Sequence, residues 1–212
     1  MPILRTRRRF LTVAVGLAAA MAITGIGDAQ ARPVKSLIEL RRKNVVMQEY
    51  DLSCGAAALA ILLRYQHGDF VSEREIAVGL MARSEYVENP LLVQIREGFS
   101  LLDLKRYVET RGYKGLGFGR MSVPNLLERA PVMVPINTHG YNHFVVFRGM
   151  LNDRVLLADP SWGNRTMTVN RFKRVWIDYP AIGQVGFVVQ SPYDNGDANV
   201  LAPDPRDFLV LR

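Results

Sequence analysis

The chain has 212 residues, enough for one globular domain with a hydrophobic core, and it contains neither a repeat nor a low-complexity tract. Its formal net charge is +7. Four arginines and one aspartate in residues 1–31 account for +3 of this charge, so the remainder carries only a scattered +4. No basic stripe with interleaved aromatic residues is present, which excludes a nucleic-acid-binding surface as the main function.

Residues 1–31 have the features of an export signal. A basic region at residues 5–9 precedes an apolar run at residues 10–26, and the segment ends in Ala29-Gln30-Ala31, a pattern that signal peptidases cut after. Residues 6–11, Thr-Arg-Arg-Arg-Phe-Leu, also resemble a twin-arginine signal. We therefore expect a periplasmic or secreted protein that has no membrane contact after cleavage. The alternatives are an uncleaved anchor or a buried helix, although the run is short for a span.

Helices are predicted in the first half of the mature chain. Residues 54–65 are almost all apolar, which is typical of a buried helix, and Gly68 ends this stretch. Capping-box patterns predict two further helices, at residues 72–81 and 100–111. A short fourth helix is expected to begin at residues 122–124.

The second half of the chain favours strands. A hairpin turn is predicted at residues 151–153, and Asn170 is expected to cap a short helix. Helices followed by an antiparallel sheet indicate an α+β domain over residues 32–190. Residues 191–212, rich in Asp, Asn and Pro, are expected to form an extended or partly mobile C-terminal extension. The predicted strands cover residues 132–137, 143–150, 154–158, 166–169 and 186–190.

Cys54 is the single cysteine of the chain. An exported protein with one thiol cannot form a disulfide within its own chain, so this residue calls for a chemical explanation. It lies at the start of a predicted helix, where unpaired N–H groups and the positive end of the dipole favour a thiolate. We therefore predict that Cys54 is a nucleophile, with a buried structural thiol as the alternative.

A cysteine nucleophile needs a general base, and the chain has three histidines. His67 lies at the far end of the helix of Cys54, roughly 20 Å away at 1.5 Å per residue, which is too far. His143 opens a predicted strand and is the favoured base, whereas His139 lies in a less constrained loop. The spacing of the two resembles a pair of metal ligands, but Gly140 argues against a helix, so neither a metal nor a cofactor is expected.

Asp159 is the predicted acceptor for the second ring nitrogen of the base. A turn at residues 151–153 would return the chain so that Asp159 lies close to the level of His143. Pro160 follows and stiffens this point of the chain. The alternative is a role as a turn or loop cap, which is common for Asp-Pro.

Gln48 is the predicted oxyanion donor. It lies six residues before Cys54, and its carboxamide could converge with the Cys54 backbone N–H on one oxygen position. An ordinary surface amide is the alternative.

These residues resemble the bacteriocin-processing, or double-glycine, cysteine peptidases (family C39) of the papain-like clan. The resemblance spans residues 42–190. It implies a papain-like fold with Cys54 as nucleophile, His143 as base and acid, Asp159 as orienting residue and Gln48 as oxyanion donor. The motifs that carry it are Gln48-x5-Cys54-Gly55-x-Ala57, His143-Phe-Val-Val and Ala158-Asp159-Pro160.

The chain departs from the family in two respects. Many members have Asp directly before the cysteine, where this chain has Ser53. The best-known members are fused to an exporter and cut leaders after Gly-Gly in the cytoplasm, whereas this chain has its own export signal. The resemblance therefore implies an endopeptidase acting on a cell-envelope or secreted protein, from a secretion, pilus or functional-amyloid system, with a Gly-Gly-type site as one candidate. The alternatives are a thiol acyltransferase or amidase and a non-catalytic peptide-binding protein.

Overall fold

The computed structural model describes residues 35–193 and 198–211, and its described residues from Ser36 onward belong to one compact unit. The predicted export signal at residues 1–31 lies outside the described residues. Within the part that is described, no helix combines the length and the apolar character needed to cross a bilayer.

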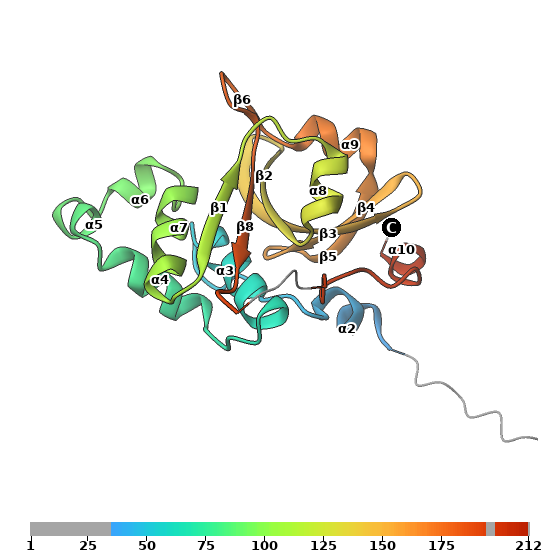
Figure 1. The fold of residues 1–212 in the computed structure, drawn as a ribbon, viewed down its shortest axis with the longest axis horizontal. Coiled ribbons are helices and arrows are strands. Elements are labelled where there is room, and N and C mark those ends of the chain that lie inside the picture. Colours follow the sequence, from blue (N-terminus) through green and yellow to red (C-terminus); the bar gives the residue numbers. More distant parts are fainter. Residues whose placement is uncertain (1–34, 194–197, 212) are drawn as a thin grey trace, which may run out of the picture. The chain divides into compact units, whose positions relative to one another are not determined.

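The described chain combines helices with one main sheet (Figure 1). Helices before and around an antiparallel sheet confirm the predicted α+β class. The helices are α2 (Leu37–Arg42), α3 (Cys54–Ile61), α4 (Glu73–Met81), α5 (Ser84–Glu88), α6 (Leu92–Ile95), α7 (Leu101–Thr110), α8 (Val123–Arg129), α9 (Val169–Val175) and α10 (Asp207–Val210). The strands are β1 (Lys114–Phe118), β2 (Val132–Thr138), β3 (Tyr141–Leu151), β4 (Arg154–Asp159), β5 (Gly163–Thr168), β6 (Asp178–Tyr179), β7 (Gly183–Gln184) and β8 (Gly186–Gln190).

Helix α3 is the buried helix that its sequence predicts. All eight of its residues are buried, because small and aliphatic side chains cover every face. It continues into a π-helical turn, Leu62–Gln66, that the sequence did not indicate, and the chain then turns at Gly68 with φ +71°.

Serine residues begin several of the other helices as predicted. The hydroxyls of Ser72, Ser100 and Ser122 each accept a bond from the third residue of their helix, in complete capping boxes. At α9 the prediction was wrong by two residues. Thr168, rather than Asn170, caps that helix, because Thr168 is the last residue in extended conformation.

The main sheet has six strands in the order β1-β8-β2-β3-β4-β5, with antiparallel neighbours. The sequence analysis missed β1, whose two glycines weaken the usual strand pattern. It also missed β6 and β7, which pair as a separate two-stranded ribbon.

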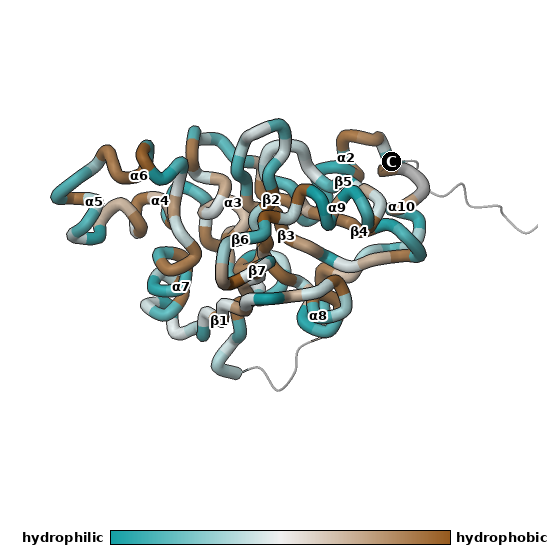
Figure 2. The backbone as a smooth tube through the Cα atoms, turned by 90° about the horizontal axis from the view of Figure 1, so that it is seen from above, coloured by the Kyte–Doolittle hydropathy of each residue, from teal (hydrophilic) through white to brown (hydrophobic). Residues whose placement is uncertain are grey.

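The two largest hydrophobic clusters of the described residues pack on this sheet. One gathers α3, α4 and α7, shown beside β1 and β8 in Figure 1, and the other gathers α8 and α9. Along β3 neighbouring residues alternate between the clusters, since Val145 belongs to the second and Val146 to the first. Figure 2 shows apolar stretches of β3 and β4 in the middle of the molecule.

A bulge in the β3–β4 hairpin determines which residues of the two strands face each other at the end far from the turn. Gly149 pairs with Leu156 near the turn, but Val146 pairs with Ala158 beyond it, so β3 has one extra residue, Arg148, in between. The bulge places Asp159 level with Val145 instead of Val146. Opposite residues of an antiparallel pair share a face, so Asp159 lies on the same face as Val145 and His143.

The described part of the C-terminal extension packs several residues against the domain, which its composition did not indicate. Leu201, Phe208 and Leu211 are buried. The guanidinium of Arg148, itself 2% exposed, donates to the Leu201 carbonyl at 2.7 Å and to Asn164 Oδ1 at 2.7 Å. This part of the tail therefore covers the bulge and completes the core.

Candidate active site

Cys54 is the first residue of α3 and is 3% exposed. The residue before it, Ser53, makes no side-chain cap to the helix. The first N–H groups of α3, including that of Cys54, thus lack the side-chain acceptor usual at a helix start. This arrangement presents a thiol beside open N–H donors at the positive end of a buried helix.

His143 and Asp159 form a buried pair. Their side chains are 5% and 3% exposed, and His143 Nε2 lies 2.7 Å from Asp159 Oδ1. His143 comes from the beginning of β3 and Asp159 from the end of β4, so the bulged hairpin brings them together. The other ring nitrogen, Nδ1, is buried and has no hydrogen-bonding partner in the described part of the chain. The imidazole is therefore anchored at one nitrogen and open at the other.

Two residues that the sequence analysis missed complete the surroundings of Asp159. The Ser161 backbone N–H donates to Oδ1 at 2.9 Å, and Arg165 Nη2 lies 2.8 Å from Oδ2. Both carboxylate oxygens are thus engaged. Arg165 lies two residues along β5 from Gly163, the partner of Asp159, and so shares its face of the sheet.

The charges at the site are set by burial and by these contacts. Burial opposes protonation of His143, but the hydrogen bond with Asp159 and the nearby Cys54 outweigh it and raise its pKa to about 9. For Asp159, burial acts to raise the pKa, and the bond to His143 together with Arg165 and Ser161 lowers it below the usual value. At neutral pH the pair therefore consists of an imidazolium and an ionised carboxylate, next to Cys54.

Gln48 lies beside the Asp159 loop. Its backbone N–H donates to the Pro160 carbonyl at 2.8 Å, and its Oε1 accepts from Ser161 Oγ at 3.2 Å. Its Nε2 donates to the Tyr50 carbonyl at 2.7 Å. Because a carboxamide nitrogen carries two hydrogens, one donor is left after this bond.

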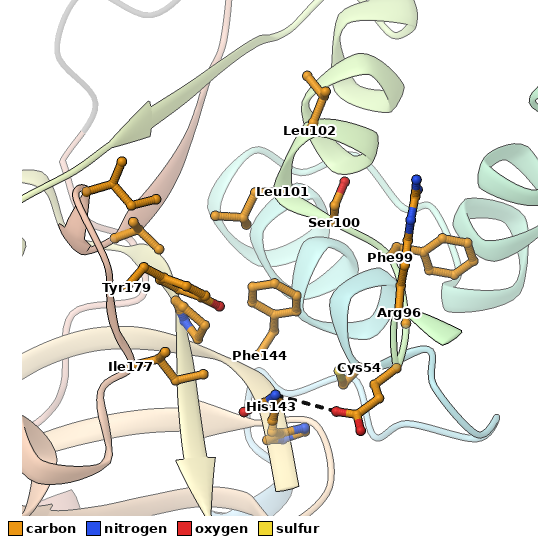
Figure 3. A pocket seen from close by; sticks show the side chains of 16 residues that line it. Cys54, Arg96, Phe99, Ser100, Leu101, Leu102, His143, Phe144, Ile177 and Tyr179 are labelled. Carbon is orange, nitrogen blue, oxygen red and sulfur yellow. Dashed lines mark hydrogen bonds between the residues drawn. The ribbon is translucent and has the colours of Figure 1, made fainter. Parts of the chain in front are cut away.

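A cavity of about 440 Å³ opens beside Cys54 and His143. Figure 3 shows these two side chains at one end of it, with Phe144, Leu101 and Tyr179 further along. The lining is largely apolar, as in most sites that hold a peptide or small ligand. One wall is the segment from Arg96 to Leu102, and Figure 3 shows Ile177 and Tyr179 across the cavity from Arg96 and Phe99. Pro135, Ile182 and Val185 also line the cavity.

The wall from Arg96 to Leu102 is fixed from behind. The buried hydroxyl of Tyr86 donates to Asp103 Oδ2 at 2.7 Å, and the same carboxylate oxygen accepts from Ser100. On the cavity side, Asn142 Nδ2 donates to Glu97 Oε2 at 3.4 Å, the dashed line in Figure 3. The cleft therefore has an ordered wall next to the cysteine.

The structure brings together three of the four predicted residues. Cys54 and His143 line the cavity, and Asp159 lies behind His143. Gln48 is bound to the loop behind Asp159 and is not among the residues that line the cavity. His139, the rival base, lies exposed in the β2–β3 turn with φ +57°.

Known proteins match the chain over most of its length. The model of the Peptidase C39 family matches residues 42–182. A protein of Pseudomonas aeruginosa named "Probable functional amyloid protease FapD" is 33% identical over 180 residues, covering 84% of this chain and 75% of that protein. A protein of the same name from Pseudomonas fluorescens is 34% identical over 187 residues, covering 87% of this chain and 78% of that protein.

Solved structures share the fold. A double glycine motif protease from an AMS/PCAT transporter, solved with its leader peptide, matches with a TM-score of 0.54 and 22% identity, covering 69% of this chain and 90% of that one. The peptidase domain of Streptococcus ComA, a bifunctional ABC transporter, also gives a TM-score of 0.54, at 16% identity, covering 69% of this chain and 97% of that one. These likenesses confirm the predicted papain-like fold.

Proposed function

The chain belongs to the Peptidase C39 family and is a cysteine-type peptidase, and from this premise we propose that it is an exported endopeptidase with a Cys54-His143-Asp159 triad. The observation that carries the proposal is the buried His143–Asp159 pair, 2.7 Å apart, beside the cysteine that opens α3. Nucleophile, base and orienting carboxylate come from three elements that meet at one cavity.

In the proposed acylation step, Cys54 Sγ reacts as the thiolate and attacks the carbonyl carbon of the scissile bond. The oxyanion that forms lies near the open N–H groups at the start of α3, and the spare N–H of Gln48 is the second proposed donor. His143, protonated at neutral pH by its pKa of about 9, gives its proton to the leaving amine. The carbon–nitrogen bond breaks, and the acyl group stays on Sγ as a thioester.

In the deacylation step, the neutral His143 takes a proton from water as the water attacks the thioester. The carboxylic acid leaves, and Cys54 and His143 regain their starting states. Asp159 keeps the ring oriented throughout by accepting from Nε2, and Arg165 and Ser161 hold Asp159 in place. Neither step needs a metal or a cofactor.

The proposed substrate is a protein of the cell envelope or one that is secreted. Two relatives are named as functional amyloid proteases, which favours a component of a functional-amyloid system. The export pattern in residues 1–31 is consistent with such a substrate. A Gly-Gly-type cleavage site is the candidate motif, because a structural neighbour is a double glycine motif protease.

The experiment that tests this function compares the wild type with Cys54→Ala on one peptide mixture. A proteome-derived peptide library is incubated with each purified protein, and new termini are identified by mass spectrometry. We expect cleavages in the wild-type digest that are missing with Cys54→Ala, enriched for glycine before the cut. Cleavage retained by Cys54→Ala would refute the proposed triad. Cleavage without glycine enrichment would refute only the proposed cleavage motif.

A further inference from the structure

Glu73 is a buried carboxylate that the proposed mechanism does not use. It is the first residue of α4 and is 4% exposed. Buried acids are rare unless their oxygens are satisfied by strong partners. The partners of Glu73 all come from the segment that leads into the cysteine, residues 48–53, here termed the nucleophile loop.

The Glu73 carboxylate accepts hydrogen bonds from three groups of this loop. Its oxygens lie 3.0 and 3.2 Å from the Glu49 backbone nitrogen, and Oε1 lies 3.3 Å from the nitrogen of Tyr50. Oε1 also accepts from the Ser53 hydroxyl. One side chain thus holds both ends of the loop between Gln48 and Cys54, the two positions from which the oxyanion donors are proposed to come.

Ser53 shows what this attachment does to α3. Serine before α2, α4, α7 and α8 caps its helix by accepting from the third helical residue. At α3 the serine makes no such bond. Its hydroxyl instead lies 2.6 Å from the Tyr50 carbonyl and donates to Glu73.

The backbone of Ser53 differs accordingly. Its φ and ψ are −96° and 11°, whereas the capping residues Ser72 and Ser100 have ψ of 157° and 160°. The extended conformation is the one that aims a hydroxyl back at the helix N–H groups. Ser53 is therefore turned away from the end of α3.

We propose that Glu73 is a positioning residue for the oxyanion hole: it fixes the nucleophile loop and withholds the Ser53 hydroxyl from α3, leaving the helix start open for the oxyanion. This inference rests on the proposed role of Cys54. Without the carboxylate, the Glu49 and Tyr50 N–H groups lose their acceptor, and the hydroxyl is free to turn toward the helix. The attack of the thiol itself does not depend on Glu73.

Two reagents separate these effects at the one cysteine of the chain. p-Nitrophenyl acetate acylates the thiol: the Sγ–carbonyl bond forms through a tetrahedral oxyanion, and p-nitrophenolate leaves. Iodoacetamide alkylates the same thiol by direct displacement of iodide, with no oxyanion. The ratio of the two rate constants therefore reports on the oxyanion hole and not on folding or access.

For Glu73→Ala we expect acylation to slow by about 10²-fold, the size of effect found when an oxyanion donor is lost. Alkylation should change by less than about threefold, because it depends on the thiolate and its exposure. Glu73→Gln keeps the shape and one acceptor and should show an intermediate ratio. It also serves as the test variant if Glu73→Ala does not fold.

Glu75→Ala is the matched control. Glu75 lies one position beyond Arg74 in the same turn of α4, is exposed, and closes the capping box with Ser72. Its loss should lower the melting temperature but leave the ratio of the two rate constants unchanged. An equal fall in ratio for Glu75→Ala would assign the effect to α4 stability and overturn the role of Glu73.

The remaining outcomes are distinct. If Glu73→Ala and Glu73→Gln keep the wild-type ratio, Glu73 does not position the oxyanion hole, and the proposed triad is untouched. If the wild type is acylated no faster than Cys54→Ala, the proposed function fails, and the role of Glu73 fails with it.

Discussion

The nucleophile and its base are held by different kinds of structure. Cys54 follows an irregular loop in which the backbone N–H groups of Glu49 and Tyr50 are bound by one carboxylate, that of Glu73. His143 and Asp159 belong to neighbouring strands that are joined by a ladder of backbone hydrogen bonds with one bulge. Changes on the sheet side should therefore alter charge while leaving geometry intact, and changes on the loop side should alter geometry.

The largest effect is expected on the sheet side for His143→Ala. Removal of the base from a catalytic triad costs about as much as removal of the nucleophile, so we expect kcat to fall by at least about 10³-fold. The melting temperature should change little, since the strands pair through backbone groups. His139→Ala, in the exposed turn of the same hairpin, is the control and should keep near wild-type activity. A reversed result would make His139 the base.

Asp159→Asn should have the next largest effect, a loss of kcat on the order of 10²- to 10⁴-fold. This substitution should also shift the pH dependence of activity in a defined direction. Burial opposes the charge on His143 and the carboxylate of Asp159 favours it, so the amide should lower the His143 pKa from about 9. The alkaline limb of the kcat/KM profile should shift to lower pH. A shift to higher pH would contradict the assigned contacts.

Gly98→Ala tests the loop side. Gly98 has φ +125°, and an added Cβ would lie 2.9 Å from the carbonyl oxygen of Leu52 in the nucleophile loop. We expect a stability loss of about 1–3 kcal/mol, measured by urea unfolding, together with reduced activity of the folded enzyme.

Gly112→Ala separates strain from contact. Gly112 also has a positive φ, +84°, but no described atom outside Gly112 and its two chain neighbours lies within 4 Å of the added carbon. It should lose stability and keep its activity. Equal activity losses in both variants would show that the contact between Gly98 and Leu52 does not matter for the site.

The smallest effect is expected for Arg165→Met. Arg165 neutralises the oxygen of Asp159 that does not face His143. We expect kcat/KM to fall by less than about tenfold, or about 1.4 kcal/mol of transition-state stabilisation. Arg154→Met, which removes only bonds to Thr166 Oγ1, is the control and should leave kcat/KM unchanged. A loss as large as that of Asp159→Asn would give Arg165 a direct role.

The elements of the fold that could be predicted from the sequence are those marked by short local sequence patterns. A capping box needs only four residues, so the starts of α4 and α7 could be predicted, and residues 122–124 indicated the start of α8. Strand β1 could not, because Lys-Gly-Leu-Gly-Phe owes its strand conformation to pairing with β8, about 70 residues away. The packing of the C-terminal segment depends on the buried guanidinium of Arg148, which no local pattern indicates.

The residues of the site divide in the same way, into those that a local pattern indicates and those that depend on distant partners. Cys54 and His143 stood out by residue type and position. The approach of Asp159 to His143 was expected from the hairpin turn, but the bulge at Arg148 that puts both on one face was not. Arg165 and Glu73 were missed because each reads locally as an ordinary charged residue of a strand or a helix start. Their roles depend on partners that the sequence does not bring together.

The proposed mechanism depends most on Cys54, His143 and Asp159 forming one electrostatic unit. The direct measurement is the titration of His143 by NMR with labelled imidazoles, assigned by comparison with His143→Ala. We predict that His143 titrates near pH 9 in the wild type, and at lower pH when Cys54→Ala removes one of the contacts that raise its pKa. A wild-type titration near 6.5 that is the same in Cys54→Ala would contradict the account.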